Sequence, residues 1–178
     1  FDHPSFGGKI TTFILFYGGE EHFDLHRRCL TSLIATTPRE RIDLRVGTNA
    51  LNAKSLEFMQ KHVDQGFISK LYIHEDNAYK YPVMREMFYD PDHPIDTKWL
   101  MWFDDDSVCD ADPNWFNKLA LHIAQHHHDK EAHMLGAKYT WRANEKQRRI
   151  MESRPWHTGR PWRDKRGQPS PNGDQILF

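Results

Sequence analysis

The sequence is poor in cysteine, in long apolar stretches and in net charge. Only Cys29 and Cys109 occur among the 178 residues. Two cysteines are too few for a disulfide scaffold, so a reducing compartment fits best. No apolar run approaches the roughly 20 residues that a membrane helix needs, and the first residues lack the basic and apolar regions of a signal peptide. We therefore expect a cytoplasmic protein without a membrane span.

The small net charge of −1 hides an uneven distribution of charge along the chain. Ten basic and three acidic side chains fall between Lys138 and Arg166, so the remainder of the chain has eight more acidic than basic side chains. This basic segment also contains Trp141, Trp156 and Trp162. Cations interleaved with flat aromatic rings suit a polyanion such as DNA or a nucleotide diphosphate.

Apolar, β-branched runs alternate with amphipathic stretches along the chain, which is long enough for one domain with a buried core. The pattern predicts strands at residues 10–17, 42–46, 68–73, 98–103 and 132–141, and helices at 23–35, 53–63, 81–88, 114–129 and 145–154. This order predicts an α/β domain over residues 1–178: a mostly parallel, Rossmann-like sheet within three α/β/α layers. A basic, tryptophan-containing helix and loop would occupy residues 142–174.

Three consecutive acids, Asp104, Asp105 and Asp106, directly follow the apolar run Trp99–Phe103. Like charges at close range repel and raise one another's pKa, so a cation is expected to compensate them. Magnesium and manganese typically bind one or two carboxylates together with substrate phosphate oxygens. The motif therefore favours a divalent metal site, and the alternative is a solvated turn.

An apolar strand that ends in Asp-x-Asp, downstream of a first strand that ends in a glycine-containing loop, resembles the GT-A fold of nucleotide-sugar glycosyltransferases, particularly the inverting family 2 group. The resemblance spans Thr11 to about Trp141. It implies that Asp104 and Asp105 face the nucleoside and sugar of the donor, a UDP-sugar. It also implies Mn²⁺ or Mg²⁺ as the cofactor, with Asp106 and Asp104 as its ligands.

The same resemblance implies further contacts with the nucleotide, from the turns after the first three strands and from the helix after the third. The residues concerned are Tyr17, Gly18, Gly19, Thr48, Asn49, Glu75, Asp76, Asn77, Lys80 and Arg85. Of the two basic residues, Arg85 is favoured because its fork of donors suits a phosphate or a carboxylate. The alternative is that these positions are ordinary turn residues and exposed helix charges.

The segments at 79–95, 99–107 and 136–142 also resemble bacterial and phage glycosyltransferases of this fold, in which a segment like PNGDQILF leads towards the catalytic base. We expect the acceptor half to lie beyond Phe178, which leaves Asp174 as a weak candidate for the base within the chain. Enzymes of the phage and base-J type, which glycosylate hydroxymethylated pyrimidines in DNA, match the basic segment best. Such an acceptor base would be flipped out of the duplex or presented in a single strand.

Other functions remain open at the level of sequence. The acceptor of the same transferase could be a glycan or lipopolysaccharide instead of DNA. A nucleotidyltransferase or phosphohydrolase would use similar metal ligands, but it would want a glycine-rich phosphate loop or further spaced acids. A nucleic-acid-binding module without catalysis would need only the basic segment.

Overall fold

The computed structural model describes residues 8–109 and 112–126. The contacts divide the chain into two units, Phe1–Gln125 and His126–Phe178. The strand expected at 132–141, the helix expected at 145–154 and the basic stretch at 142–174 all lie outside the described residues. No helix of the described part is long and apolar enough to cross a membrane.

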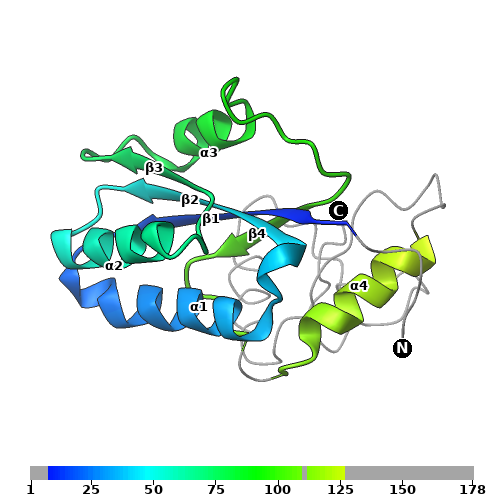
Figure 1. Cartoon of the computed structure of the whole chain (residues 1–178). Coiled ribbons are helices and arrows are strands. Elements are labelled where there is room, and N and C mark those ends of the chain that lie inside the picture. The colour runs from blue at the N-terminus through cyan, green and yellow to red at the C-terminus, as the bar shows by residue number, and fades with distance from the viewer. Residues whose placement is uncertain (1–7, 110–111, 127–178) are drawn as a thin grey trace, which may run out of the picture. The chain divides into compact units, whose positions relative to one another are not determined.

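Four parallel strands form the sheet, in the order β3-β2-β1-β4 (Figure 1). The strands are β1 (Ile10–Tyr17), β2 (Ile42–Asn49), β3 (Lys70–His74) and β4 (Leu100–Asp104). The helices are α1 (Phe23–Thr36), α2 (Ala53–Asp64), α3 (Lys80–Phe88) and α4 (Trp115–His126), with the short 3₁₀ turns η1 (Glu20–His22) and η2 (Arg39–Arg41). Each predicted strand and helix of this region is therefore present, with shifted ends.

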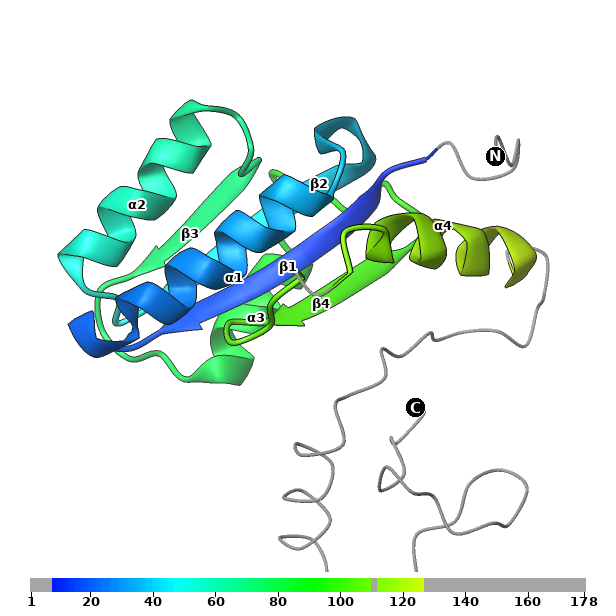
Figure 2. The ribbon, with the colours of Figure 1, turned by 90° about the horizontal axis from the view of Figure 1, so that it is seen from below.

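Helices cover both faces of the sheet. Helices α1, α2 and α4 lie on one face, and α3 lies on the other, where it contacts β1 and β2 (Figures 1 and 2). On the α4 side, the Trp115 indole donates a hydrogen bond to Thr36 Oγ1 of α1 at 2.8 Å. The predicted α/β fold, with a parallel sheet between two helical layers, is confirmed.

The close approach of α3 to the sheet depends on a glycine in β2. A Cβ at Gly47 would lie 2.6 Å from Met87 Sδ and 3.0 Å from Leu15 Cδ1. Met87 belongs to a buried cluster with Phe13, Leu15, Tyr72 and Val83. Because interiors are packed to crystal density, a side chain at residue 47 would push the helix away. The glycine thus makes room for the Met87, Leu15 and Val83 side chains between α3 and the sheet.

Two strand assignments needed correction. Strand β2 runs to Asn49, whereas a polar turn was expected from residue 47 onward. Thr48 and Asn49 remain in the sheet because they pair with Ile73 and His74 of β3 and are almost fully buried. The apolar run before the aspartates is typical of a buried strand, yet the residues of β4 are exposed or half-buried because it is the last strand in the described sheet.

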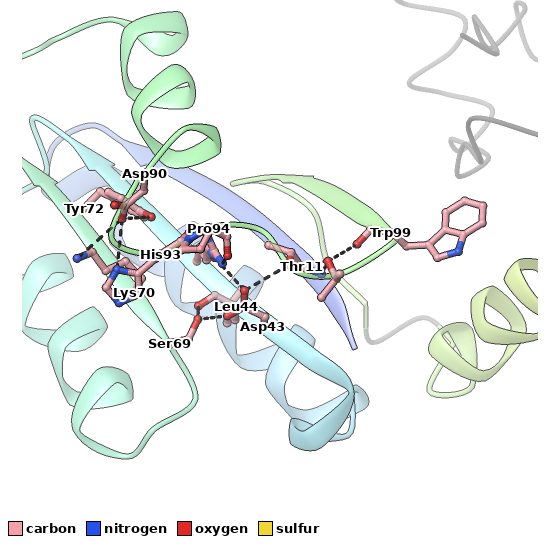
Figure 3. A network of polar contacts seen from close by, with 12 residues as sticks. Thr11, Asp43, Leu44, Ser69, Lys70, Tyr72, Asp90, His93, Pro94 and Trp99 are labelled. Carbon is pink, nitrogen blue, oxygen red and sulfur yellow. Dashed lines mark hydrogen bonds and ion pairs between the residues drawn. The ribbon is translucent and has the colours of Figure 1, made fainter. Parts of the chain in front are cut away.

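An ion pair between Arg45 and Asp43 holds the loop between α3 and β4 against the sheet. Figure 3 labels Asp43 and two residues of that loop, His93 and Pro94. Arg45 Nε donates to Asp43 Oδ2 at 2.8 Å, and Arg45 Nη2 donates to the Pro94 carbonyl at 3.1 Å. A third bond runs from Nη1 to the His93 carbonyl. Only 6% of the Arg45 side chain is exposed. The guanidinium therefore fixes the path by which the chain returns to β4.

We expect Arg45→Met to lower the free energy of unfolding by about 3 kcal/mol, because the half-buried Asp43 carboxylate loses its cationic partner and two carbonyls lose their donor. The Thr11 and Ser69 hydroxyls would remain as donors to Asp43. Urea unfolding followed by circular dichroism measures the change. Arg28→Met, at an exposed position of α1, is the matched control and should shift stability by less than about 0.5 kcal/mol. Equal stability of the two variants would contradict this role for Arg45.

Candidate functional site

The chain reverses its direction of travel across the sheet between β1 and β4. From β1 it proceeds outward to β2 and β3, and then crosses back over the α3 face to β4 on the other side. In open α/β sheets, ligands bind beyond the carboxyl ends of the strands at such a switch point. Because Leu15 pairs with Asp104, residues 17–19 and the three aspartates meet at this edge.

The three aspartates do not point the same way. Asp104 Oδ1 accepts a hydrogen bond from Trp102 Nε1 at 3.2 Å and lies 3.7 Å from Lys80 Nζ of α3. Asp105 Oδ2 lies 3.8 Å from His26 Nε2 of α1, on the opposite face of the sheet. Asp106 is exposed in the turn that the Ser107 N–H to Asp104 carbonyl bond closes at 3.0 Å. Consecutive side chains alternate between faces at the end of a strand, which explains the divergence.

Burial and neighbouring negative charges disfavour the ionised form of Asp105 in this turn. Burial raises the pKa of Asp105 above its usual value, and the neighbouring Asp106 and Asp104 carboxylates raise it further. His26 and a hydrogen bond from the Tyr17 main chain act in the opposite direction but do not prevail. A positive ligand at this turn would therefore be attracted by the carboxylates and would lower the pKa of Asp105.

A buried histidine of α1, His26, packs against the aspartate turn and the end of β1. His26 has no exposed surface, and its Nε2 lies 3.1 Å from the Tyr17 carbonyl, closer than to Asp105. Its Nδ1 lies 3.4 Å from Ser55 Oγ. Burial lowers the pKa of His26 despite the attraction of Asp105. A neutral imidazole with its proton on Nε2 satisfies both contacts by donating to Tyr17 and accepting from Ser55.

Sequence reasoning missed His26 and its neighbours Asn52 and Ser55. Asn52 caps α2 by accepting from the Ser55 N–H at 2.9 Å, and its Nδ2 lies 3.4 Å from the Gly18 carbonyl. A cap residue before an amphipathic run is a recognisable signal for Asn52. No sequence signal distinguishes His26 from other histidines on a buried helix face.

The polar residues expected to read the nucleotide after β2 and β3 are largely engaged within the protein. Thr48 is buried and its hydroxyl donates to the Tyr72 carbonyl at 3.3 Å. Asn49 and Asn77 bond to each other at 3.0 Å. Glu75 and Asp76 are exposed. Among these five positions, only the two acids have side chains turned to solvent and free of a hydrogen bond within the described residues.

The two basic residues of α3 lie in different surroundings. Lys80, at the start of the helix, is the one near the aspartates. Arg85 is exposed and lines a separate hollow of about 510 Å³ with Lys70, Tyr72, Tyr89 and Asp90. None of the three aspartates lines that hollow.

The aspartate turn offers the oxygen ligands that a hard divalent cation prefers. No group of three or more His, Cys, Asp or Glu side chains is arranged to hold a metal within residues 8–109 and 112–126. Magnesium, however, commonly takes only one or two carboxylates and completes its shell with phosphate and water. The mutual repulsion of the carboxylates fits such a partly protein-bound cation. Asp174 and the basic segment lie outside the described residues.

Comparison with solved structures finds distant similarity to S. aureus TarS. TarS matches with a TM-score of 0.49 at 14% identity over 67% of this chain and 20% of its own. TarS 1–349 matches with a TM-score of 0.49 at 14% identity, over 75% of this chain and 39% of its own. Its complex with UDP-GlcNAc gives 0.48 at 14% identity, over 73% and 37%. The chain thus spans less than half the length of each of these structures.

No protein-family model matches the chain, and comparison with curated proteins likewise finds no match.

We expect the protein to lose stability as the pH falls from about 7.5 to 5.5, in part through His26. Its pKa is lowered in the folded protein from an ordinary value of 6.5, so the unfolded chain takes up the proton first. The stabilisation is complete above the ordinary pKa and is lost as the pH falls below it. Urea unfolding at the two pH values measures the loss.

His26→Gln should show a smaller loss over the same range, because glutamine can bond to Tyr17 and Ser55 without titrating. His122→Gln, at an exposed position of α4, is the control and should behave as the parent protein does. The raised pKa of Asp105 acts with the opposite sign, since it favours folding as its proton is taken up at lower pH. An identical loss in the parent and in His26→Gln would contradict the assignment.

Proposed function

We propose that this chain carries the donor site of a metal-dependent glycosyltransferase, which transfers a sugar from a nucleotide-sugar, most simply a UDP-sugar, to an acceptor hydroxyl. One observation carries the proposal: three carboxylates at the carboxyl end of β4 lie beside the glycine-containing end of β1, at the switch point of a parallel sheet. That position and that chemistry suit a diphosphate bound through a cation.

The end of β1 leads into a glycine-containing turn that follows an exposed aromatic residue. Gly18 has a φ of +115°, and a Cβ there would lie 2.5 Å from His22 Nδ1. Gly19 follows, and Tyr17 is 49% exposed. An exposed aromatic ring beside two glycines can stack on a nucleobase while the main chain contacts the ribose or phosphate. We assign the nucleoside to this loop, with Asp76 as a further candidate contact.

Asp106 and Asp104 are the proposed ligands of Mn²⁺ or Mg²⁺. When bound, the metal supplies positive charge opposite the departing diphosphate. Lys80 adds a second positive charge beside Asp104, which would also favour the negatively charged donor phosphates. Asp105 lies 3.8 Å from His26, and we assign it to the sugar or ribose of the donor instead.

The acceptor side of the reaction is proposed from sequence alone. An inverting transfer needs a base to deprotonate the acceptor hydroxyl, and Asp174 is the candidate within the chain. Residues Lys138–Arg166 would bind DNA, with a hydroxymethylated pyrimidine as the acceptor. Both lie outside the described residues, and a glycan acceptor is the competing outcome of the second experiment below.

The donor site is tested by calorimetric titration of UDP in the presence and absence of manganese. We expect binding that depends on manganese and that weakens at least tenfold in Asp106→Ala, because the variant loses a metal ligand. Glu40→Gln removes one negative charge at the amino end of β2 and should leave the affinity unchanged. Manganese-independent binding, or no binding at all, would exclude the proposed donor site.

The acceptor is tested by titrating DNA duplexes with and without hydroxymethylcytosine at several salt concentrations. Binding through basic side chains should weaken steeply as salt rises. Replacing Arg148 and Arg149 with glutamine should reduce both the affinity and its salt dependence, and should leave the UDP titration unchanged. Absence of salt-dependent DNA binding would reject DNA and would leave a glycan as the acceptor to be tried.

A further inference from the structure

We propose that Asn49 and Asn77 are positioning residues, which together fix the turn between β3 and α3 and thereby hold the Lys80 ammonium beside Asp104. The sequence suggested that these two asparagines read a nucleobase, but the contacts assign their side chains to the protein itself. The effect on geometry stands on those contacts alone. Its consequence for donor binding rests on the proposed function.

Asn49 is the buried half of this pair, with 3% of its surface exposed. Its Nδ2 donates to Asn77 Oδ1 at 3.0 Å, and its Oδ1 accepts from the Ala78 N–H at 2.7 Å. The reversed amide would set two donors against each other at Ala78, so the hydrogen bonds select a single orientation. Asn49, the last residue of β2, therefore holds the turn that follows β3 by two hydrogen bonds.

Asn77 adds a further hydrogen bond within the same turn. Its Oδ1 also accepts from the Tyr79 N–H at 2.9 Å, so a single oxygen ties Asn49 to the residue that precedes α3. The neighbouring strand end is braced as well, because the Ala50 N–H donates to the His74 carbonyl at 3.0 Å. The turns after β2 and β3 thus form one cross-linked unit.

Backbone strain lies at both ends of this unit. In the described residues, the only non-glycine residues with positive φ are Ala50 at 52° and Tyr79 at 63°. Side chains rarely tolerate this region, and such residues persist only where surrounding contacts determine them. The hydrogen bonds to Asn77 and His74 are contacts of that kind.

The strained turn sets the position of Lys80, which follows Tyr79 directly and begins α3. Lys80 Nζ lies 3.7 Å from Asp104 Oδ1 and 5.6 Å from the centre of the Trp102 ring. About half of each side chain of the ion pair is exposed, and exposed pairs contribute little by themselves. The pair is therefore too weak to hold the turn, and the buried amide supplies the constraint.

The indole N–H of Trp102 reports directly on this arrangement, because it donates to the same Asp104 oxygen that Lys80 approaches. We expect Lys80→Met to shift the Trp102 indole resonance in ¹⁵N-labelled protein, with Trp102→Phe identifying the peak. Asn77→Ala should shift it in the same direction, and the double variant should shift it no further than Lys80→Met. Asn77 is exposed, so its replacement leaves the core intact.

Two further variants separate positioning from a general loss of structure. Asn77→Asp keeps an acceptor oxygen for Asn49 and Tyr79 and should return the peak to near its original position. Lys61→Met removes a lysine at an exposed site on α2 and should leave the peak in place. An unmoved peak in Asn77→Ala, or additive shifts in the double variant, would overturn the proposal.

A titration with UDP and manganese provides the second arm. Asn77→Ala and Lys80→Met should each weaken binding several-fold, and together by no more than Lys80→Met alone. If the parent protein fails to bind UDP with manganese, the proposed function fails, while the indole resonances still decide whether Asn77 acts through Lys80. Independent, multiplying losses in the double variant would count against positioning.

Discussion

The parallel pairing of β4 with β1 is the constraint on which the site depends. Because Leu15 pairs with Asp104, the residue that ends β4 is level with a point two residues before the end of β1. The acidic turn therefore emerges beside the glycines that follow Tyr17. Arg45 anchors the loop that brings the chain back to β4, and Gly47 lets α3 lie close enough to cross the sheet. Buried contacts far from the edge thus determine which side chains meet there.

Strand geometry then divides the acidic turn between the two faces of the sheet. Asp104 is directed to Lys80 and Trp102, and Asp105 to His26. The first environment is half-exposed and contains the Lys80 ammonium. The second is more buried, and burial there outweighs the attraction between Asp105 and His26 for both partners. Because side chains alternate between the two faces of a strand, the adjacent Asp104 and Asp105 lie in different surroundings.

Within the described residues, sequence patterns were sufficient for the order of elements and for the place of the acidic turn, because buried strands and amphipathic helices differ in period. They failed where polar groups are satisfied by distant partners. Thr48 and Asn49 looked like turn residues, yet pairing with β3 keeps them in the sheet. Periodicity also cannot show that Asn77, 28 positions along the chain, completes the hydrogen bonds of Asn49. The role of His26 could not be predicted, because it depends on contacts with Tyr17, Ser55 and Asp105 that only the fold brings together.

Hydrogen bonding within the protein also determines which polar residues at the carboxyl edge of the sheet remain available to a ligand. A buried polar group must be paired within the protein, and once paired it has little left to offer a substrate. Asn49 meets that condition through Asn77 and Ala78, so its contribution to binding is indirect. Asp106 and Asp76 are exposed. Their carboxylates are solvated, so a ligand can bind them by displacing water. We therefore expect the exposed residues of this edge to contact the ligand, and the buried residues to keep the edge rigid.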